Sequence, residues 1–133
     1  MIKHRQKIII NANIEKTWFF LINLSRSLVF DRYYRLIELP SDYKVHDKLK
    51  FNIYAQYFLK IHKMKASIID LQTPELLEIK CAGQGVRIFN HKKKFILSNK
   101  NSITELRCSI EGEFENKLIN FFYSHFINLA LKL

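Results

Sequence analysis

The sequence has few of the residues and runs that mark specialised classes of protein. It contains two cysteines, Cys81 and Cys108, and no CxxC spacing. A disulfide framework needs several paired cysteines, so that class is excluded. Both cysteines lie in strand-like runs, and we expect them to be small buried apolar residues.

Long hydrophobic runs are also missing. The basic residues at positions 3–5 are followed only by Ile8 to Ile10, which is too short for the apolar core of a signal peptide. The apolar C-terminal stretch is too short to span a bilayer, and polar residues such as Asn120 and Asn128 interrupt it. We therefore expect a soluble, cytoplasmic protein.

The sequence lacks the motifs of several enzyme classes. It contains no HExxH motif, no clustered cysteines and histidines, no glycine-rich phosphate loop and no nucleophile elbow. Zinc sites, nucleotide hydrolysis and serine hydrolase chemistry therefore have no support. We expect no metal ion and no other cofactor.

What the sequence does contain is an excess of positive charge on an otherwise ordinary composition. Its 133 residues are 48% hydrophobic and 14% aromatic, which predicts one folded domain over residues 1–133 with a sizeable core. The formal net charge is +10. Such a charge favours an anionic partner, although lysines can also serve solubility alone.

The chain is expected to begin with a strand and two short helices. Residues 2–10 end in a β-branched run, which is typical of a strand. Asn13 can cap a helix whose first turn contains Glu15. One face of that helix is apolar and consists of Ile14, Trp18, Leu21 and Ile22. Residues 24–30 are predicted to form the second helix, and both should pack against one end of a sheet.

Six further strands are expected, each bounded by a turn. They cover residues 33–39, 45–54, 57–70, 77–81, 86–97 and 104–110. Within 57–70 the apolar phase changes from the odd-numbered Leu59 and Ile61 to the even-numbered Met64. This change predicts a β-bulge near His62 and Lys63.

The last predicted element is a long helix over residues 114–131, after Gly112. Its apolar residues recur at helical spacings and include Phe114, Leu118, Phe121, Phe122, Phe126 and Leu129. A helix this apolar must be covered over much of its surface. The fold class is therefore α+β, with a curved antiparallel sheet of about seven strands around this helix. A space between the two would suit an apolar ligand.

This arrangement resembles the START-related superfamily, which includes the birch-pollen allergens, polyketide cyclases and lipid-transfer domains. Residues 10–18 look like the family's strand-to-helix entry, and residues 70–77 are similar to its Asp-Pro-rich hairpin. Residues 102–106, followed by Gly112, look like the strand that precedes its final helix. The shared fold is called the helix-grip. The resemblance implies a hydrophobic ligand cavity, and members of similar size are often polyketide cyclase-like or dehydrase-like, or resemble an accessory protein of carbon monoxide dehydrogenase.

Three functions are compatible with these features. The first is binding of a hydrophobic small molecule or lipid between the sheet and the last helix. The second is a polyketide cyclase or dehydratase-like enzyme that uses the same cavity, so whether the chain is an enzyme stays open. The third is a basic module that binds RNA, the ribosome or an anionic membrane.

Eight side chains are predicted to line the cavity. They are Phe51, Ile53, Phe89, His91, Cys108, Phe122, His125 and Phe126. His91 falls in the inward register, where it could hydrogen-bond a ligand or act as an acid or base. It could equally be a solvated histidine at the sheet rim. His125 could point into the cavity or be an ordinary core or rim residue. Tyr33, Tyr57 and Arg87 are lesser candidates for ligand contacts.

The lysines show an order of their own. Lys48, Lys50, Lys60, Lys80, Lys92 and Lys94 alternate with the apolar positions. This pattern predicts a basic stripe on the convex outer face, which could meet anionic lipid headgroups or RNA. A solvated sheet face has the same pattern, so this alternative stays open.

Overall fold

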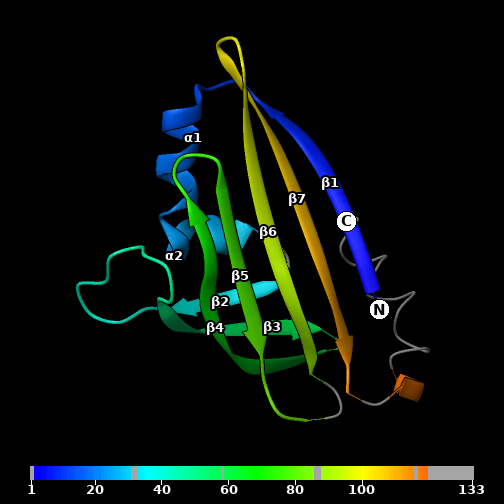
Figure 1. The fold of residues 1–133 in the computed structure, drawn as a ribbon. Coiled ribbons are helices and arrows are strands. Elements are labelled where there is room, and N and C mark those ends of the chain that lie inside the picture. Colours follow the sequence, from blue (N-terminus) through cyan, green and yellow to red (C-terminus); the bar gives the residue numbers. More distant parts are fainter. Residues whose placement is uncertain (1, 31–32, 58, 86–87, 116, 120–133) are drawn as a thin grey trace.

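A seven-stranded antiparallel sheet forms the main layer of the protein. The computed structural model describes residues 2–30, 33–57, 59–85, 88–115 and 117–119. The strands are β1 (Ile2–Ile10), β2 (Tyr34–Glu38), β3 (Lys50–Tyr57), β4 (Lys60–Gln72), β5 (Leu76–Ala82), β6 (Phe89–Lys100) and β7 (Ile103–Phe114). Their order is β1-β7-β6-β5-β4-β3-β2 (Figure 1). The predicted number of strands is confirmed, and β2 to β7 form a meander that β1 extends at the edge beside β7.

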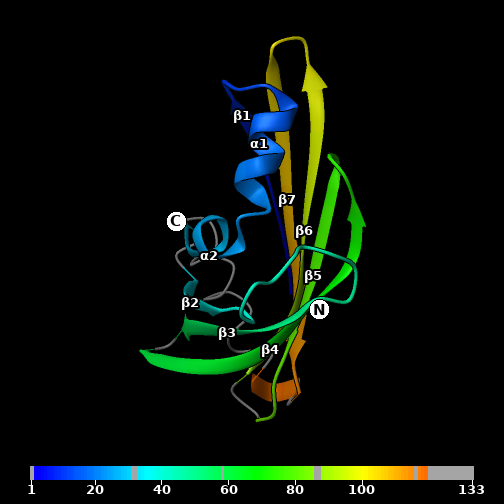
Figure 2. The same cartoon turned by 90° about the vertical axis from the view of Figure 1, so that its left-hand side faces the viewer.

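The sheet is strongly curved. In Figure 1, β6, β7 and β1 run along the length of the molecule, whereas β2 and β3 run across it. Figure 2 shows the sheet from the side, with β2, β3 and β4 curling toward the short helices. The helices therefore lie on the concave side of the sheet.

Short helices connect the two edges of the sheet. They are α1 (Ile14–Leu21), α2 (Leu24–Ser27) and the 3-10 helix η1 (Leu28–Phe30), and they lead from β1 to β2. The predicted cap is confirmed, because the Asn13 side-chain oxygen accepts the Lys16 backbone N–H at 2.8 Å. Trp18 and Leu21 are buried on the inner face of α1, which contacts β6 and β7. The Thr104 hydroxyl also donates to the Ala12 carbonyl at 2.8 Å and so ties the start of this segment to β7.

The alternation of side chains along the strands places the core on the concave face. Leu49, Phe51 and Ile53 are all buried, as their spacing predicts. Phe89, His91, Phe95 and Leu97 are likewise buried along β6. The register of β6 with β7 sets Phe95 opposite Cys108 and Leu97 opposite Leu106, so the inward positions of the two strands coincide.

The predicted bulge near His62 and Lys63 is wrong. The β3–β4 register is continuous there, and the irregularity lies further on, between Ile68 and Asp70 in the pairing with β5. The odd-numbered Leu59 and Ile61 do not face the core, because they are 99% and 58% exposed. The exposed apolar residues at the start of β4 therefore produced a change in the sequence pattern without a change in the strand.

The predicted boundary between the last strand and the last helix is also wrong. β7 continues through Gly112 to Phe114, and Phe114 is buried in the sheet rather than part of a helix. Residues 117–119 are helical. The rest of the predicted helix, including Phe122, His125 and Phe126, lies outside the described residues.

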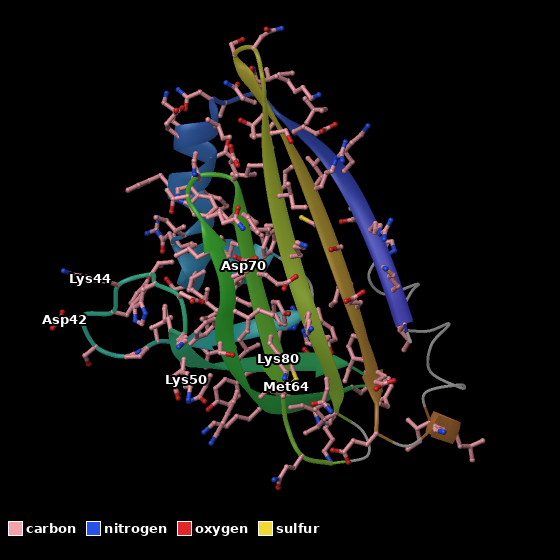
Figure 3. The ribbon with its side chains drawn as sticks, viewed as in Figure 1. Asp42, Lys44, Lys50, Met64, Asp70 and Lys80 are labelled. Atoms are coloured by element: carbon pink, nitrogen blue, oxygen red, sulfur yellow. The ribbon has the colours of Figure 1, made fainter. Side chains whose placement is uncertain are left out.

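Three of the six predicted lysines form one row on the convex face. The register connects Lys50, Ser67, Lys80 and Lys92 across β3, β4, β5 and β6, with Lys50 and Lys80 labelled in Figure 3. Lys94 lies one row away and pairs with Glu78 at 3.9 Å.

The other two lysines do not belong to that row. Lys60 shares the phase of the buried Met64, so its predicted place on the convex face is wrong. Lys48 precedes β3 in a turn. That turn ends the long β2–β3 connection, in which Asp42 and Lys44 point away from the sheet (Figure 3).

No helix within the described ranges combines the length and the apolar character that crossing a membrane requires.

Removal of the helix cap should destabilise the protein. We expect Asn13→Ala to lower the free energy of unfolding by about 1 kcal/mol, because the first turn of α1 loses its side-chain acceptor. Urea unfolding followed by circular dichroism measures this change. Asn11→Ala is the matched control at an exposed position before the helix. Equal losses in the two variants would contradict the role of the cap.

Candidate functional site

The concave face contains a buried polar pair, formed by Tyr34 of β2 and His91 of β6. The Tyr34 hydroxyl lies 2.6 Å from His91 Nε2. Three strands separate β2 from β6 in the sheet order, so a flat sheet would place them roughly 19 Å apart at about 4.8 Å per strand. The hydrogen bond is possible only because the sheet curls and brings its far strands together.

The second nitrogen of His91 fixes its tautomer. Nδ1 lies 2.7 Å from the carbonyl oxygen of Phe89, which can only accept a hydrogen bond. Nδ1 therefore carries the proton and donates to Phe89, while Nε2 accepts from the Tyr34 hydroxyl. The His91 side chain is 3% exposed, so the interpretation of a solvated rim histidine is wrong.

Burial keeps both members of the pair neutral. Desolvation lowers the pKa of His91 to about 4, and the hydrogen bond from Nδ1 to Phe89 opposes this only in part. Desolvation also raises the pKa of Tyr34 well above its ordinary value, and the nearby Cys81 and Tyr33 act in the same direction. The Cys81 thiol lies 3.8 Å from the Tyr34 hydroxyl, and burial raises its pKa to about 12. The group is therefore polar but uncharged at neutral pH.

Aromatic rings hold the imidazole in place. The ring of Phe89 lies 5.1 Å from that of His91 with an interplanar angle of 13°, and Tyr34 lies 5.8 Å away at 20°. Tyr33 meets the imidazole edge-on at 5.4 Å. Phe114 extends the cluster by contact with Phe89 at 5.4 Å. A ring with neighbours on this many sides has little freedom to turn.

Gly112 makes room for this arrangement. It lies directly opposite His91 in the β6–β7 register. A Cβ atom at this position would collide with the Asn90 carbonyl oxygen and with His91 Cβ and Cα. Gly112 therefore permits a close approach between two strands in the interior of β7.

Lys93 brings a cationic side chain to the same face. It follows His91 at the next inward position of β6 and is 7% exposed. Its Nζ lies 5.1 Å from the centre of the Tyr34 ring and 5.5 Å from that of Phe95, distances typical of cation–π contacts. Burial lowers its pKa to about 8, and the neighbouring Cys108 opposes the shift.

The structure brings five of the eight predicted site residues to one face. Phe51, Ile53, Phe89 and His91 are buried there, and Cys108 of β7 is half-buried. The other three, Phe122, His125 and Phe126, lie outside the described residues. Of the lesser candidates, Tyr33 contacts His91, whereas Arg87 and the Tyr57 side chain are not among the parts described.

Sequence reasoning missed Tyr34 as the partner of His91. Strict alternation along β2 would have put Tyr34 and Leu36 on the same face. The β2–β3 register instead shifts between these two residues, so Tyr34 and Ile37 are buried while Leu36 is exposed. No local signal reveals such a shift. For Lys93 a signal existed, because its inward register follows from that of Phe89 and His91.

Acid should destabilise the fold through His91. An unfolded histidine titrates near pKa 6.5, so between pH 6.5 and about 4 the unfolded chain binds more protons than the folded one. Stability therefore falls as the pH is lowered through this window, by roughly 3 kcal/mol in total.

The test compares unfolding free energies across that range. His91→Gln, which keeps an acceptor for Tyr34, should remove most of this pH dependence. His46→Gln, at an exposed position, should leave it intact. A His91→Gln protein with an unchanged pH dependence would show that another group is responsible.

Comparison with known proteins gives a fold but no close relative. No protein-family model and no curated protein matches the sequence. A START superfamily protein from Mycobacterium smegmatis matches with a TM-score of 0.71 and 9% identity, over 98% of this chain and 92% of that one. Ginseng major latex-like protein 151 from Panax ginseng matches with a TM-score of 0.65 and 10% identity, over 96% of this chain and 94% of that one.

A third similar structure is a two-domain protein. The di-domain ARO/CYC protein StfQ of the steffimycin biosynthetic pathway matches with a TM-score of 0.74 and 6% identity, over 98% of this chain and 45% of that one. At these identities the likeness concerns the fold alone. The curved sheet and its short helices therefore have the helix-grip architecture of the START-related proteins.

Proposed function

We propose that the concave face of the sheet binds an apolar small molecule or lipid. The observation that carries the proposal is one strongly curved, apolar face with a neutral hydrogen-bonded pair at its centre. Phe51 and Ile53 of β3 and Phe89 of β6 supply apolar surface, and Cys108 of β7 is half-buried beside them. Ligand sites commonly combine an apolar lining with a few fixed polar groups. The similarity in fold to a START superfamily protein supports the proposal.

The polar pair suggests what such a ligand would offer. The Tyr34 hydroxyl donates its proton to His91, so its oxygen accepts from the Cys81 thiol and keeps one lone pair for a further hydrogen bond. Both ring nitrogens of His91 are engaged and the ring is neutral. A hydroxyl group on an otherwise apolar molecule fits this site better than a carboxylate facing the pair. Phe122, His125 and Phe126 remain proposed lining residues.

A cyclase or dehydratase-like reaction in the same place is the second candidate. The 2.6 Å contact between Tyr34 and His91 favours it, because a phenol and an imidazole in direct contact can pass a proton. The polyketide ARO/CYC protein StfQ, which is similar in fold, supports the same alternative. The raised pKa of Tyr34 and the lowered pKa of His91 weigh against this reaction, because each group resists the charge that proton transfer would create.

Bulk added to the concave face should block binding. We expect Cys108→Phe to weaken the binding of the neutral probe Nile red by about tenfold or more, because the ring would occupy space that the ligand needs. Ser109→Phe is the control, since successive residues of β7 face opposite sides of the sheet. Fluorescence titration measures both dissociation constants. Equal affinities in the two variants would overturn the proposed location.

A carrier releases its ligand unchanged, whereas an enzyme releases a product of different mass. Any apolar molecule recovered by organic extraction of the purified protein is incubated with fresh protein and followed by mass spectrometry. We expect an unchanged mass, as a carrier predicts. A product formed by the loss of water in the wild type but not in Tyr34→Phe, with Nile red binding retained, would favour the cyclase or dehydratase alternative.

A further inference from the structure

A compact group of basic side chains lies on the convex face, away from the polar pair. The strand register arranges six outward residues of β1, β7 and β6 in two adjacent rows. Arg5, Ser109 and Lys94 form the first row. Lys7, Arg107 and Ile96 form the second. Four of the six positions are therefore cationic, and we call this group the basic grid.

Neighbouring carboxylates neutralise the basic grid only in part. Glu105 is buried and lies 3.6 Å from Lys7 and 3.3 Å from Arg107, so one carboxylate serves two cations. Glu78 lies 3.9 Å from Lys94. Both carboxylates lie beside the basic grid and not within its two rows. Four positive charges thus face two negative ones, and an excess of about two remains on adjoining strands.

Such an arrangement costs folding energy unless something offsets the repulsion. Lys7 lies directly opposite Arg107, and like charges in opposing positions destabilise a sheet. Glu105 orients both side chains while leaving them 62% and 61% exposed. Their charged groups therefore remain accessible to a ligand in solution.

The basic grid surrounds a hollow of suitable size. The hollow has a volume of about 450 Å³, and its lining includes Arg5, Lys7, Lys94 and Arg107. Ser109 lies within the grid and offers a hydroxyl, and Ile96 contributes an apolar wall. Volumes of this order are typical of sites for small molecules. No acidic side chain lines the hollow among the residues described.

We propose that the basic grid binds a small molecule that bears phosphate groups. The planar guanidinium groups of Arg5 and Arg107 suit two-point contact with phosphate oxygens, and the Lys94 ammonium adds a third donor. The Ser109 hydroxyl can donate to the same group, while Ile96 meets an organic portion of the ligand. The four cations of the basic grid distinguish this site from the apolar concave face, although Cys108 also borders the hollow.

Isothermal titration calorimetry with pyrophosphate and with ATP, at one fixed ionic strength, tests the proposal. We expect saturable binding by the wild type and a loss of about tenfold or more in Arg107→Gln, because a charge-assisted hydrogen bond is removed. Arg107→Lys should bind with intermediate affinity, since it keeps the charge but not the planar fork. The side chain is exposed, so these variants should fold, which circular dichroism verifies.

The control removes an equal charge elsewhere on the same face. Lys65 is exposed and lies opposite Asn52 and Ala82, outside the basic grid, and Lys65→Gln should bind within about twofold of the wild type. Ser109→Phe should abolish pyrophosphate binding yet retain Nile red.

Three results would overturn the proposal. The first is absence of saturable binding to pyrophosphate and ATP. The second is an equal loss in Lys65→Gln and Arg107→Gln, which would indicate general charge attraction. The third is binding to single-stranded RNA, or to phosphatidylcholine vesicles containing phosphatidic acid, that pyrophosphate does not displace. That outcome would assign the basic grid to a macromolecular or membrane partner instead.

Discussion

The hydrogen bond between Tyr34 and His91 depends directly on the curvature of the sheet. It joins strands that have three others between them, at a distance of 2.6 Å. Its geometry requires β2 and β3 to turn across the ends of β5 and β6, as Figures 1 and 2 show. The register shift in β2 and the absence of a side chain at Gly112 both serve the same arrangement. Removal of one partner in the folded protein would leave the other with a buried unsatisfied polar atom, at a cost of about 1–3 kcal/mol.

The two faces of the sheet have opposite chemistry because strands alternate their side chains. The concave face consists mainly of apolar residues, and burial there keeps His91 and Tyr34 uncharged. The convex face collects lysines and arginines, which the register sorts into rows. Lys93 departs from this division, because it lies among the rings of Tyr34 and Phe95.

Local patterns predicted much of the fold correctly. Asn13 was identifiable as a helix cap because its side chain acts on a backbone group three residues away. Alternation along β3 and β6 placed Phe51, Ile53, Phe89 and His91 on the buried face. Predictions failed where the same pattern had two physical explanations. Leu59 and Ile61 are apolar but exposed, and Gly112 permits a close strand contact instead of ending the strand.

The sequence by itself determined the seven strands, the capped first helix and the inward phase of most strands, because these depend on residues a few positions apart. Tertiary structure alone decided that Tyr34 meets His91, since that pair is 57 residues apart and depends on sheet curvature and a register shift. It likewise decided which cations stand together. Arg5 and Lys7 lie far from Lys94 and Arg107 along the chain, and only strand pairing places their like charges around one hollow.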